Sequence, residues 1–385
     1  MYISEDIKYI GVNDRDIDLF EGQYAVPHGM SYNSYIIMDE QIAVLDTVDA
    51  RFGDEWLDKM DAELGARLPD YLIVQHMEPD HSANLANFAN KYPSAKIVAS
   101  AKAFAMMKGF FGSDYADRRI VVGDGATLSL GSHELTFVTA PMVHWPEVIV
   151  TYDKAEKTLF SADGFGKFGA LDADEPWDDE ARRYYIGIVG KYGAQVEALL
   201  KKASALDIER ICPLHGPVLK ENLGHYIGLY STWASYRPEA KGVAIAYASI
   251  YGNTKRAALM LADMLTERGE QVEVFDLARC DMAEATAAAF KLDRLVLASS
   301  TYNAGVFPYM REYLAHLTER GFRARKVALI ENGSWAPMAA KIMRGELEAM
   351  KDIEFAENTV RINSAPDAAC EAALIALADE LSAKA

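Results

Sequence analysis

Apolar and polar positions alternate in two different ways along the chain. Up to about residue 236, short apolar runs of strand length are separated by polar turns and joined by a few segments with helical periodicity. We expect strands at 34–38, 42–46, 71–75, 96–100, 127–130, 135–138, 148–151, 158–161 and 208–212, and helices at 52–64, 83–92, 101–110 and 178–205, the last interrupted around 187–193. A mixture of this kind suits an α+β arrangement in which two sheets are packed between helices.

The pattern changes near Arg237-Pro238, where we place a domain boundary. After it, strand-length and helix-length segments alternate regularly. We expect strands at 243–249, 271–277, 294–299, 326–330 and 355–362, and helices at 254–268, 283–290, 308–320, 337–350 and 367–383. Five strands joined by crossover helices form a doubly wound parallel sheet. The sequence therefore predicts two domains, 1–238 and 239–385.

Composition restricts the classes of function. Among 385 residues, 39 are Lys or Arg and 57 are Asp or Glu, so the formal net charge is −18. This charge argues against nonspecific binding to nucleic acid and to an anionic membrane surface. The N-terminus lacks the basic start and apolar core of a signal peptide, and no apolar run reaches the ~20 residues of a membrane span.

The three cysteines, Cys212, Cys280 and Cys370, are far apart and form no C-x-x-C pair. They indicate a reducing compartment, and we expect a cytoplasmic protein. Three thiolates also exclude a fused metal module that is held by four cysteines.

Four side chains that can bind metal fall within one six-residue turn, 76–81, between a predicted buried strand and a predicted helix. They are His76, Glu78, Asp80 and His81. His76 and Glu78 are two positions apart, so in an extended segment they point to the same side. Any one of these residues alone would suit a polar surface turn, but all four together favour a site for two metal ions.

Three further candidates follow predicted strands in turns rich in Gly or Pro. His144 lies in Ala-Pro-Met-Val-His-Trp-Pro, Asp163 precedes Gly164, and His215 lies in Pro-Leu-His-Gly-Pro. Each of them alone would better suit a structural loop histidine or an Asx turn. The ends of strands are nevertheless where an α/β sandwich opens its site.

Loops of the second domain suit a flavin. The loop 249–254, Ser-Ile-Tyr-Gly-Asn-Thr, matches the S/T-x-x-G-x-T phosphate loop of flavodoxins, in which hydroxyls, backbone N–H groups and a helix N-terminus hold a phosphate without Lys. A tight turn between strand and helix is the alternative. Two later loops lie at strand ends beside the expected switch point. The candidate flavin-binding residues are Ser249, Tyr251, Gly252, Asn253, Thr254, Thr301, Tyr302, Asn303, Ala304, Gly305, Asn332, Gly333, Ser334 and Trp335, with Trp335 expected to stack on the ring.

The order of the metal-type residues resembles that of the metallo-β-lactamase fold. In the zinc members of that fold the second position is usually His, whereas here it is Glu78. A ligand set richer in oxygen favours non-haem iron over a structural zinc site. The resemblance implies one metal held by His76, Glu78 and His144, a second held by Asp80, His81 and His215, and Asp163 between them.

Taken as a whole, the chain resembles the two-domain flavodiiron proteins, with further matching stretches at 26–35, 162–171 and 181–185. The resemblance implies FMN, two iron ions, and reduction of O2 to water, of NO to N2O, or of both. It also implies rubredoxin or a similar protein as electron donor, and a head-to-tail homodimer or a dimer of dimers. His81 is the least secure ligand, because in some members of the family the residue at this position does not bind iron. Since product formation consumes protons, His28 and Tyr192 are candidates for donors near the metals.

Two other functions are compatible with parts of the sequence. One is a dizinc hydrolase of the glyoxalase II or lactamase type, fused to a flavodoxin; Glu78 and the flavin loops argue against it. The other is an electron carrier with an inactive first domain, against which the full set of ligand positions argues. No motif determines whether O2 or NO is preferred.

Overall fold

The computed structural model describes residues 2–383, and contacts between Cα atoms divide the chain into two units. The first unit extends to Tyr185 and resumes at Tyr192–Ser231; the second comprises Ile186–Lys191 and the chain from Thr232 onward. The division falls within α7 (Leu223–Ala234), before the predicted boundary at 238. No helix within residues 2–383 is long and apolar enough to cross a membrane.

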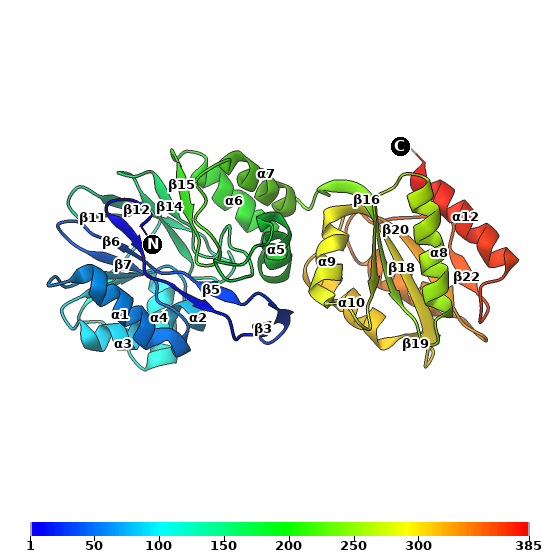
Figure 1. The fold of residues 1–385 in the computed structure, drawn as a ribbon, viewed down its shortest axis with the longest axis horizontal. Helices are drawn as coiled ribbons and strands as arrows, with labels where there is room; N and C mark the ends of the chain where they lie inside the picture. The colour runs from blue at the N-terminus through cyan, green and yellow to red at the C-terminus, as the bar shows by residue number, and fades with distance from the viewer. Residues whose placement is uncertain (1, 384–385) are drawn as a thin grey trace. The chain divides into compact units, whose positions relative to one another are not determined.

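The first unit has two sheets packed face to face (Figure 1). The six-stranded sheet has the order β1 (Ile7–Tyr9), β6 (Tyr35–Ile37), β7 (Ala43–Leu45), β8 (Tyr71–Val74), β9 (Lys96–Ala99), β10 (Arg119–Val121). The five-stranded sheet has the order β11 (Thr127–Ser129), β12 (Glu134–Thr139), β13 (Ile149–Asp153), β14 (Thr158–Phe160), β15 (Arg210–Cys212). Two small hairpin-like pairs add β2 (Val12–Asp14) with β5 (Met30–Tyr32), and β3 (Leu19–Phe20) with β4 (Tyr24–Ala25).

Helices cover the outer faces of these sheets and complete the expected αββα sandwich (Figure 1). Three helices connect strands of the six-stranded sheet: α1 (Gly53–Leu64) lies between β7 and β8, α3 (Leu85–Lys91) between β8 and β9, and α4 (Ala101–Phe111) between β9 and β10. The later helices are α5 (Trp177–Tyr184), α6 (Gly193–Ala203) and α7. The core between the sheets contains alternate strand residues such as Ile73 and Phe160, because successive side chains of a strand point to opposite faces.

The predicted long helix 178–205 is interrupted where the sequence indicated, by a π turn at Tyr185–Val189 and a 3-10 turn at Gly190–Tyr192. The strands β1 to β5 and β10, and helix α7, were not predicted. The early strands have only two or three residues each and include polar positions such as Asn13, so they carry too little alternation to be recognised.

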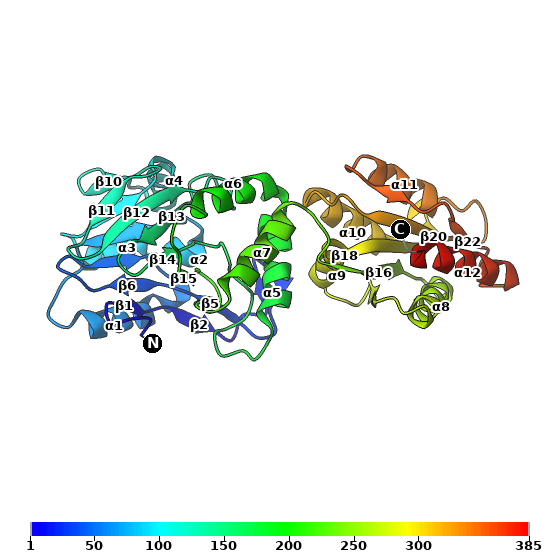
Figure 2. The same ribbon diagram turned by 90° about the horizontal axis from the view of Figure 1, so that it is seen from above.

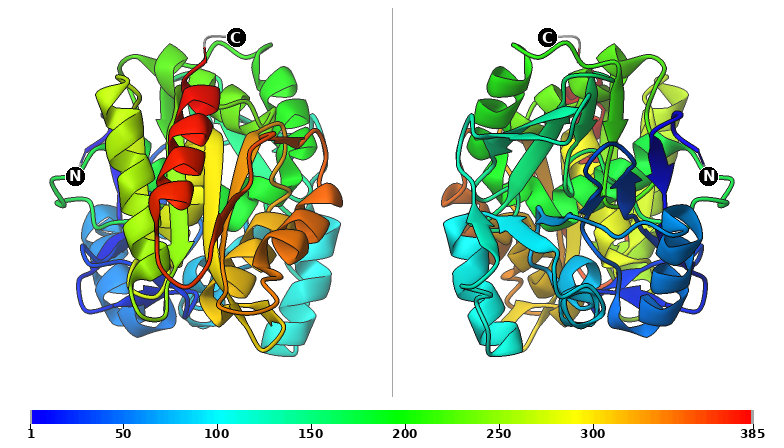
Figure 3. Two further views of the ribbon diagram at one scale, coloured as in Figure 1. Left: turned by 90° about the vertical axis from the view of Figure 1, so that its right-hand side faces the viewer. Right: turned by 90° about the vertical axis from the view of Figure 1, so that its left-hand side faces the viewer.

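The second unit is a doubly wound sheet with the order β17 (Val272–Asp276), β16 (Ala240–Ala248), β18 (Leu292–Tyr302), β20 (Lys326–Asn332), then β21 (Glu354–Phe355) and β22 (Val360–Ile362). These strands are parallel, and the unpredicted β19 (Gly305–Val306) pairs antiparallel with β18. Helices α8 (Asn253–Glu267) and α12 (Ala368–Ser382) lie side by side on one face (Figure 3, left), and α10 (Pro308–Glu319) and α11 (Ala339–Glu348) lie on the other (Figure 2); α9 (Met282–Lys291) contacts α10.

The predicted single strand 355–362 is wrong. It consists of β21 and β22, which both pair with β20. Phe355 pairs with Val327, but Val360 pairs with Ile330, so five steps of chain oppose three on β20. The two additional residues of this segment loop out of the sheet and divide the strand.

A buried ion pair gives the first unit a pH-dependent stability. His133 is buried; its Nδ1 lies 2.9 Å from Asp153 Oδ2 and its Nε2 3.4 Å from Asp6 Oδ2. The hydrogen bond with Asp153 raises the pKa of His133 to about 9, although burial acts in the opposite direction. Because the pKa is raised on folding, the stabilisation is complete below the ordinary value of about 6.5 and is lost as the pH rises through 9.

We therefore expect the free energy of unfolding of the first unit to fall by about 2 kcal/mol between about pH 6 and about pH 10. Urea unfolding at a series of pH values measures this, with His133→Asn as the comparison. Equal pH dependence of the two proteins would show that the pair contributes nothing.

Candidate metal centre and flavin pocket

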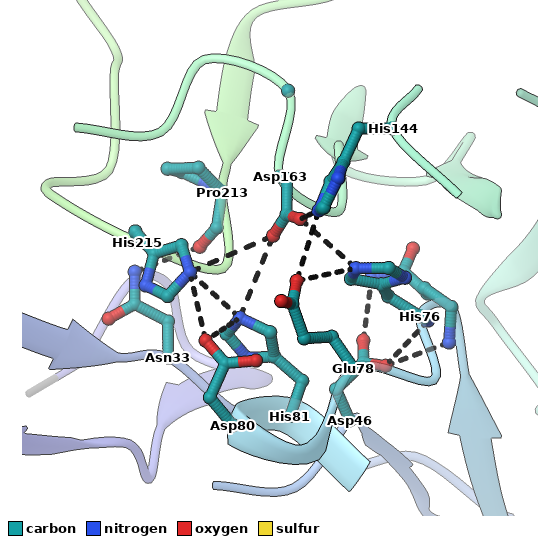
Figure 4. Close-up of polar contacts among 12 residues, drawn as sticks. Asn33, Asp46, His76, Glu78, Asp80, His81, His144, Asp163, Pro213 and His215 are labelled. Carbon is teal, nitrogen blue, oxygen red and sulfur yellow. Dashed lines mark hydrogen bonds and ion pairs between the residues drawn. The ribbon is translucent and has the colours of Figure 1, made fainter. Parts of the chain in front are cut away.

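Seven metal-type side chains, separated by up to 139 positions in the sequence, meet at the carboxyl ends of strands in the first unit (Figure 4). His76 and Glu78 follow β8, and the short helix α2 (Pro79–Ser82) presents Asp80 and His81. The remaining three follow β12, β14 and β15: His144, Asp163 and His215. The structure thus brings together every residue that the sequence suggested as a metal ligand.

The first group of donor atoms comes from His76, Glu78, His144 and Asp163. Glu78 Oε2 lies 3.2 Å from His76 Nε2 and 3.0 Å from His144 Nε2. Asp163 Oδ2 lies 3.2 Å from each of the same two nitrogens. Four donor atoms therefore surround one point.

The second group comes from Asp80, His81 and His215. Asp80 Oδ2 lies 3.2 Å from His81 Nε2 and 3.3 Å from His215 Nε2, and these two nitrogens are 2.9 Å apart. The other oxygen of Asp163, Oδ1, lies 3.6 Å from His81 Nε2 and 3.8 Å from His215 Nε2. Asp163 therefore presents one oxygen to each group.

These separations suit ligands of an ion. Two atoms bound to a common ion at 2.0–2.2 Å lie about 3 to 3.5 Å apart at tetrahedral or octahedral angles. Within residues 2–383, both carboxylate oxygens of Asp80 and of Asp163 are buried and make no hydrogen bond. Buried carboxylates without donors are costly unless a cation neutralises them, so the residues present fit two metal ions.

Protons compete with metal ions for the donor atoms of this cluster. Burial raises the pKa of Asp163, but the nearby imidazoles of His76 and His144 outweigh it and hold that pKa well below its usual range. Burial lowers the pKa of His144, while Asp163 and Glu78 raise it to about 9. Metal ions would release these protons on binding.

Residues that the sequence did not single out hold the ligands in place. Glu147, buried, lies with Oε1 2.8 Å from His76 Nδ1 and accepts a hydrogen bond of 2.8 Å from the Met77 N–H. Asp46 follows β7 with a φ of +54° and accepts hydrogen bonds from the N–H groups of Gln75 (2.7 Å) and His76 (3.3 Å). The role of Asp46 could have been suspected from the sequence, because this carboxylate ends the predicted strand that precedes β8.

Glu147→Ala is expected to weaken metal binding at the first group by about tenfold to a hundredfold, because it frees the His76 ring and leaves the buried Met77 N–H without an acceptor. Titration of the apoprotein with ferrous iron measures the affinity. Glu147→Gln, which keeps an acceptor oxygen, serves as the comparison and should lose less. Equal affinity in the alanine variant and the unchanged protein would contradict this role.

The other histidines of the cluster differ in how they are held. His215 Nδ1 donates to the Ser31 carbonyl oxygen at 2.7 Å, whereas within residues 2–383 the buried His81 Nδ1 has no hydrogen-bond partner. Metal-binding histidines usually donate their second ring nitrogen to a partner. His81, the ligand that the sequence left least secure, is also the one with the least support.

The role of the candidate proton donors, His28 and Tyr192, stays a prediction. His28 is exposed, with Nε2 3.9 Å from Glu175 Oε2, and Tyr192 is the residue before α6. Within residues 2–383 no contact joins either to the cluster. A different tyrosine, Tyr184 at the end of α5, packs against His215 with 5.5 Å between ring centroids. In the sequence, Tyr184 is one of two adjacent tyrosines, and no motif distinguishes it from Tyr192 as a neighbour of the ligands.

In the second unit, a cavity of about 460 Å³ opens at the ends of β16, β18 and β20. Eleven of the predicted flavin-binding residues line it: Ser249, Tyr251, Asn253, Thr254, Thr301, Asn303, Ala304, Asn332, Gly333, Ser334 and Trp335. Ile250, Ser300, Ala336 and Ser364 also line it and were not predicted. Gly252, Tyr302 and Gly305 are not on its wall within the described chain.

The cavity suits a flavin with a phosphate. Helix α8 begins at Asn253 without a side-chain cap, so its first N–H groups are available to an anion. Thr254 Oγ1 lies 2.9 Å from Ser300 Oγ and accepts a hydrogen bond of 3.3 Å from Asn332 Nδ2, which ties the three loops together. Tyr251 and Trp335 are 95% and 83% exposed, so their rings are free to stack on a planar ligand.

Comparisons with known proteins agree with both sites. A family model described as ODP family beta lactamase matches residues 30–216, and the flavodoxin model matches residues 245–372. A nitric oxide reductase of Moorella thermoacetica is 30% identical over 361 residues, which are 91% of this chain and 90% of that protein.

Solved structures agree over nearly the whole chain. The rubredoxin oxygen:oxidoreductase of Desulfovibrio gigas superposes with a TM-score of 0.92 at 26% identity, covering 99% of this chain and 97% of that one. The flavodiiron protein of Giardia intestinalis gives a TM-score of 0.92 at 26% identity, with 98% and 96% covered. The expected metallo-β-lactamase-like and flavodoxin-like folds are confirmed, and the chain belongs to the flavodiiron protein family.

Proposed function

We propose that this oxidoreductase transfers electrons from a donor protein, by way of FMN, to a diiron centre at which O2 is reduced to water, NO to N2O, or both. The observation that carries the proposal is the shared carboxylate of Asp163, with one oxygen toward each group of ligands. The flavin pocket in the same chain supplies the means of delivering electrons.

The ligand chemistry supports iron rather than zinc. Of the seven donor residues, four are imidazoles and three are carboxylates, and none is a thiolate. Glu78 contributes an oxygen between His76 and His144. A pair of iron ions in this cluster would supply electrons and open coordination positions for a diatomic gas.

The protein's own residues position and shield the site. Glu147 and the Ser31 carbonyl orient His76 and His215. The rings of Phe20, Tyr32 and Tyr184 surround His215, with centroids 5.4, 6.0 and 5.5 Å from its ring, and limit the access of water. The N-terminus of α8 would hold the phosphate of FMN, and Trp335 would be available to stack on its ring.

The proposal includes rubredoxin or a similar protein as electron donor, because residues 1–385 contain three cysteines, one too few for a four-cysteine iron site. We also propose a head-to-tail homodimer. The exposed aromatic residues at the flavin pocket, Tyr251 and Trp335, support a contact with another protein at that place.

Anaerobic turnover tests the function. Protein loaded with iron and FMN is reduced with reduced rubredoxin, and O2 or NO is added in turn to the same sample while gas consumption and N2O formation are measured. We expect rapid consumption of at least one gas, and loss of it in a zinc-loaded sample. Thioester hydrolysis by the zinc form, without gas reduction by the iron form, would instead support a hydrolase.

A further inference from the structure

A second cavity, of about 220 Å³, lies in the first unit between the five-stranded sheet and helices α6 and α7. The strands β12 to β15 turn Phe137, Ile149, Phe160 and Cys212 toward the core between the sheets. Their neighbours on the opposite face, Val138, Val150, Leu159 and Ile211, form one wall of the cavity. Helices α6 and α7 form the other wall, through Val196, Leu200, Ala203 and Ile227.

The cavity offers no unused hydroxyl to a ligand, as far as residues 2–383 show. Ser161 Oγ donates to the Gly164 carbonyl oxygen at 2.6 Å, and Ser204 Oγ donates to the Lys201 carbonyl oxygen at 2.8 Å. Tyr230 Oη accepts from the Phe165 N–H at 2.5 Å. Polar ligands are recognised by unpaired donors and acceptors, so this cavity favours an apolar one.

One end of the cavity adjoins two metal-type residues. Ser161, Gly164 and Phe165 line it and belong to the turn that carries Asp163. Val143 lines it and directly precedes His144. Gly164, the residue after Asp163, contributes no side chain to the wall.

The other end reaches solvent. Ile227 of α7 is 37% exposed, and Ala203 of α6 is half-buried. The cavity therefore extends from the surface between α6 and α7 to the turn that holds Asp163.

We propose that this cavity collects and holds a small apolar gas, O2 or NO, on its way to the metal cluster; the role rests on the proposed function. Apolar cavities of about 150 Å³ stay dry and bind molecules such as benzene or xenon, and one water occupies about 30 Å³ in the liquid, so this cavity has room for several diatomic molecules. Dissolved gas concentrated beside the ligands raises the rate of encounter with the metals at low gas concentration.

Two matched variants of α6 test the proposal. Ala203→Phe places a ring in the cavity, whereas Ala198→Phe places the same ring on the exposed face of the same helix. Xenon pressure applied to crystals of the holoenzyme should reveal an atom between the five-stranded sheet and α6 in the unchanged protein and in Ala198→Phe, and none in Ala203→Phe.

In kinetics, Ala203→Phe should raise the KM for the gas by at least about threefold with kcat unchanged, since only delivery is impaired. Ala198→Phe should match the unchanged protein. If Ala203→Phe does not fold, Ala203→Leu narrows the cavity with a smaller side chain and should give a smaller shift in the same direction.

Absence of xenon from the cavity would overturn the proposal, and so would an unchanged KM in a folded Ala203 variant that has lost xenon. An acyl chain found in the cavity of the purified protein would overturn it in favour of a lipid-type ligand. A protein that binds xenon here but reduces neither gas would overturn the proposed function together with the delivery role, whereas gas reduction without xenon binding would overturn the cavity's role alone.

Discussion

Asp163→Asn is expected to remove metal from both groups of ligands and to abolish gas reduction. Asp163 Oδ2 lies 3.2 Å from His76 Nε2 and His144 Nε2, and Oδ1 faces His81 and His215. An asparagine offers one neutral oxygen and an NH2 group that cannot bind a metal, so one group loses its shared oxygen and the other loses a negative charge. We expect iron to fall from about two ions per chain to well under one, and turnover to fall by at least about 10³-fold.

Metal analysis and turnover with the preferred gas measure the two effects. Asp172→Asn, an exposed position nearby in the sequence, is the control and should keep both iron and activity. FMN content should be unchanged in both variants, because the flavin pocket lies in the other unit. Full iron occupancy in Asp163→Asn would contradict a bridging role for this carboxylate.

The ligands were predictable because each follows a strand. His76, Asp163 and His215 come directly after apolar runs, and the carboxyl ends of neighbouring strands meet at one edge of a sheet. In the loop that the sequence suggested for the phosphate, Gly252 adopts a φ of +93° that few other residues tolerate.

The groups that hold the candidate ligands in place were not predictable in the same way. Glu147 reaches His76 across 71 positions of sequence, and the Ser31 carbonyl reaches His215 across 184. Such contacts depend on how the two sheets pack, and a backbone carbonyl leaves no trace in residue type. The same holds for Tyr184, which ends α5 and packs against His215, whereas Tyr192 ends the later 3-10 turn.

The second cavity, between the five-stranded sheet and α6, illustrates a further limit of prediction from sequence. Its wall residues, such as Val150 and Leu159, have the composition of an ordinary core, and the sequence marks them as buried. Whether α6 packs closely on them depends on the volumes of the side chains between the helix and the sheet. The hydrophobic periodicity of the sequence does not encode these volumes. The sequence therefore indicates candidate ligands, but it does not indicate cavities.

The second large effect is expected from Ser249→Asp in the flavin pocket. Ser249 Oγ accepts a hydrogen bond of 3.1 Å from the Gly252 N–H, and an aspartate oxygen accepts the same bond, so the loop keeps its shape. The variant adds a negative charge beside the α8 N-terminus, where the phosphate is expected to bind. Two unit charges 4 Å apart repel by about 4 kcal/mol at an effective dielectric constant near 20.

We expect the Kd for FMN to rise at least about a hundredfold in Ser249→Asp, with little change in Ser249→Asn, which has the same shape without the charge. Quenching of flavin fluorescence during titration of the flavin-free protein measures both. Riboflavin, which has the same ring and no phosphate, should bind both variants equally, because only the phosphate meets the new carboxylate. Equal losses for FMN and riboflavin would mean that the loop has collapsed, and equal FMN affinity in the two variants would place the phosphate away from Ser249.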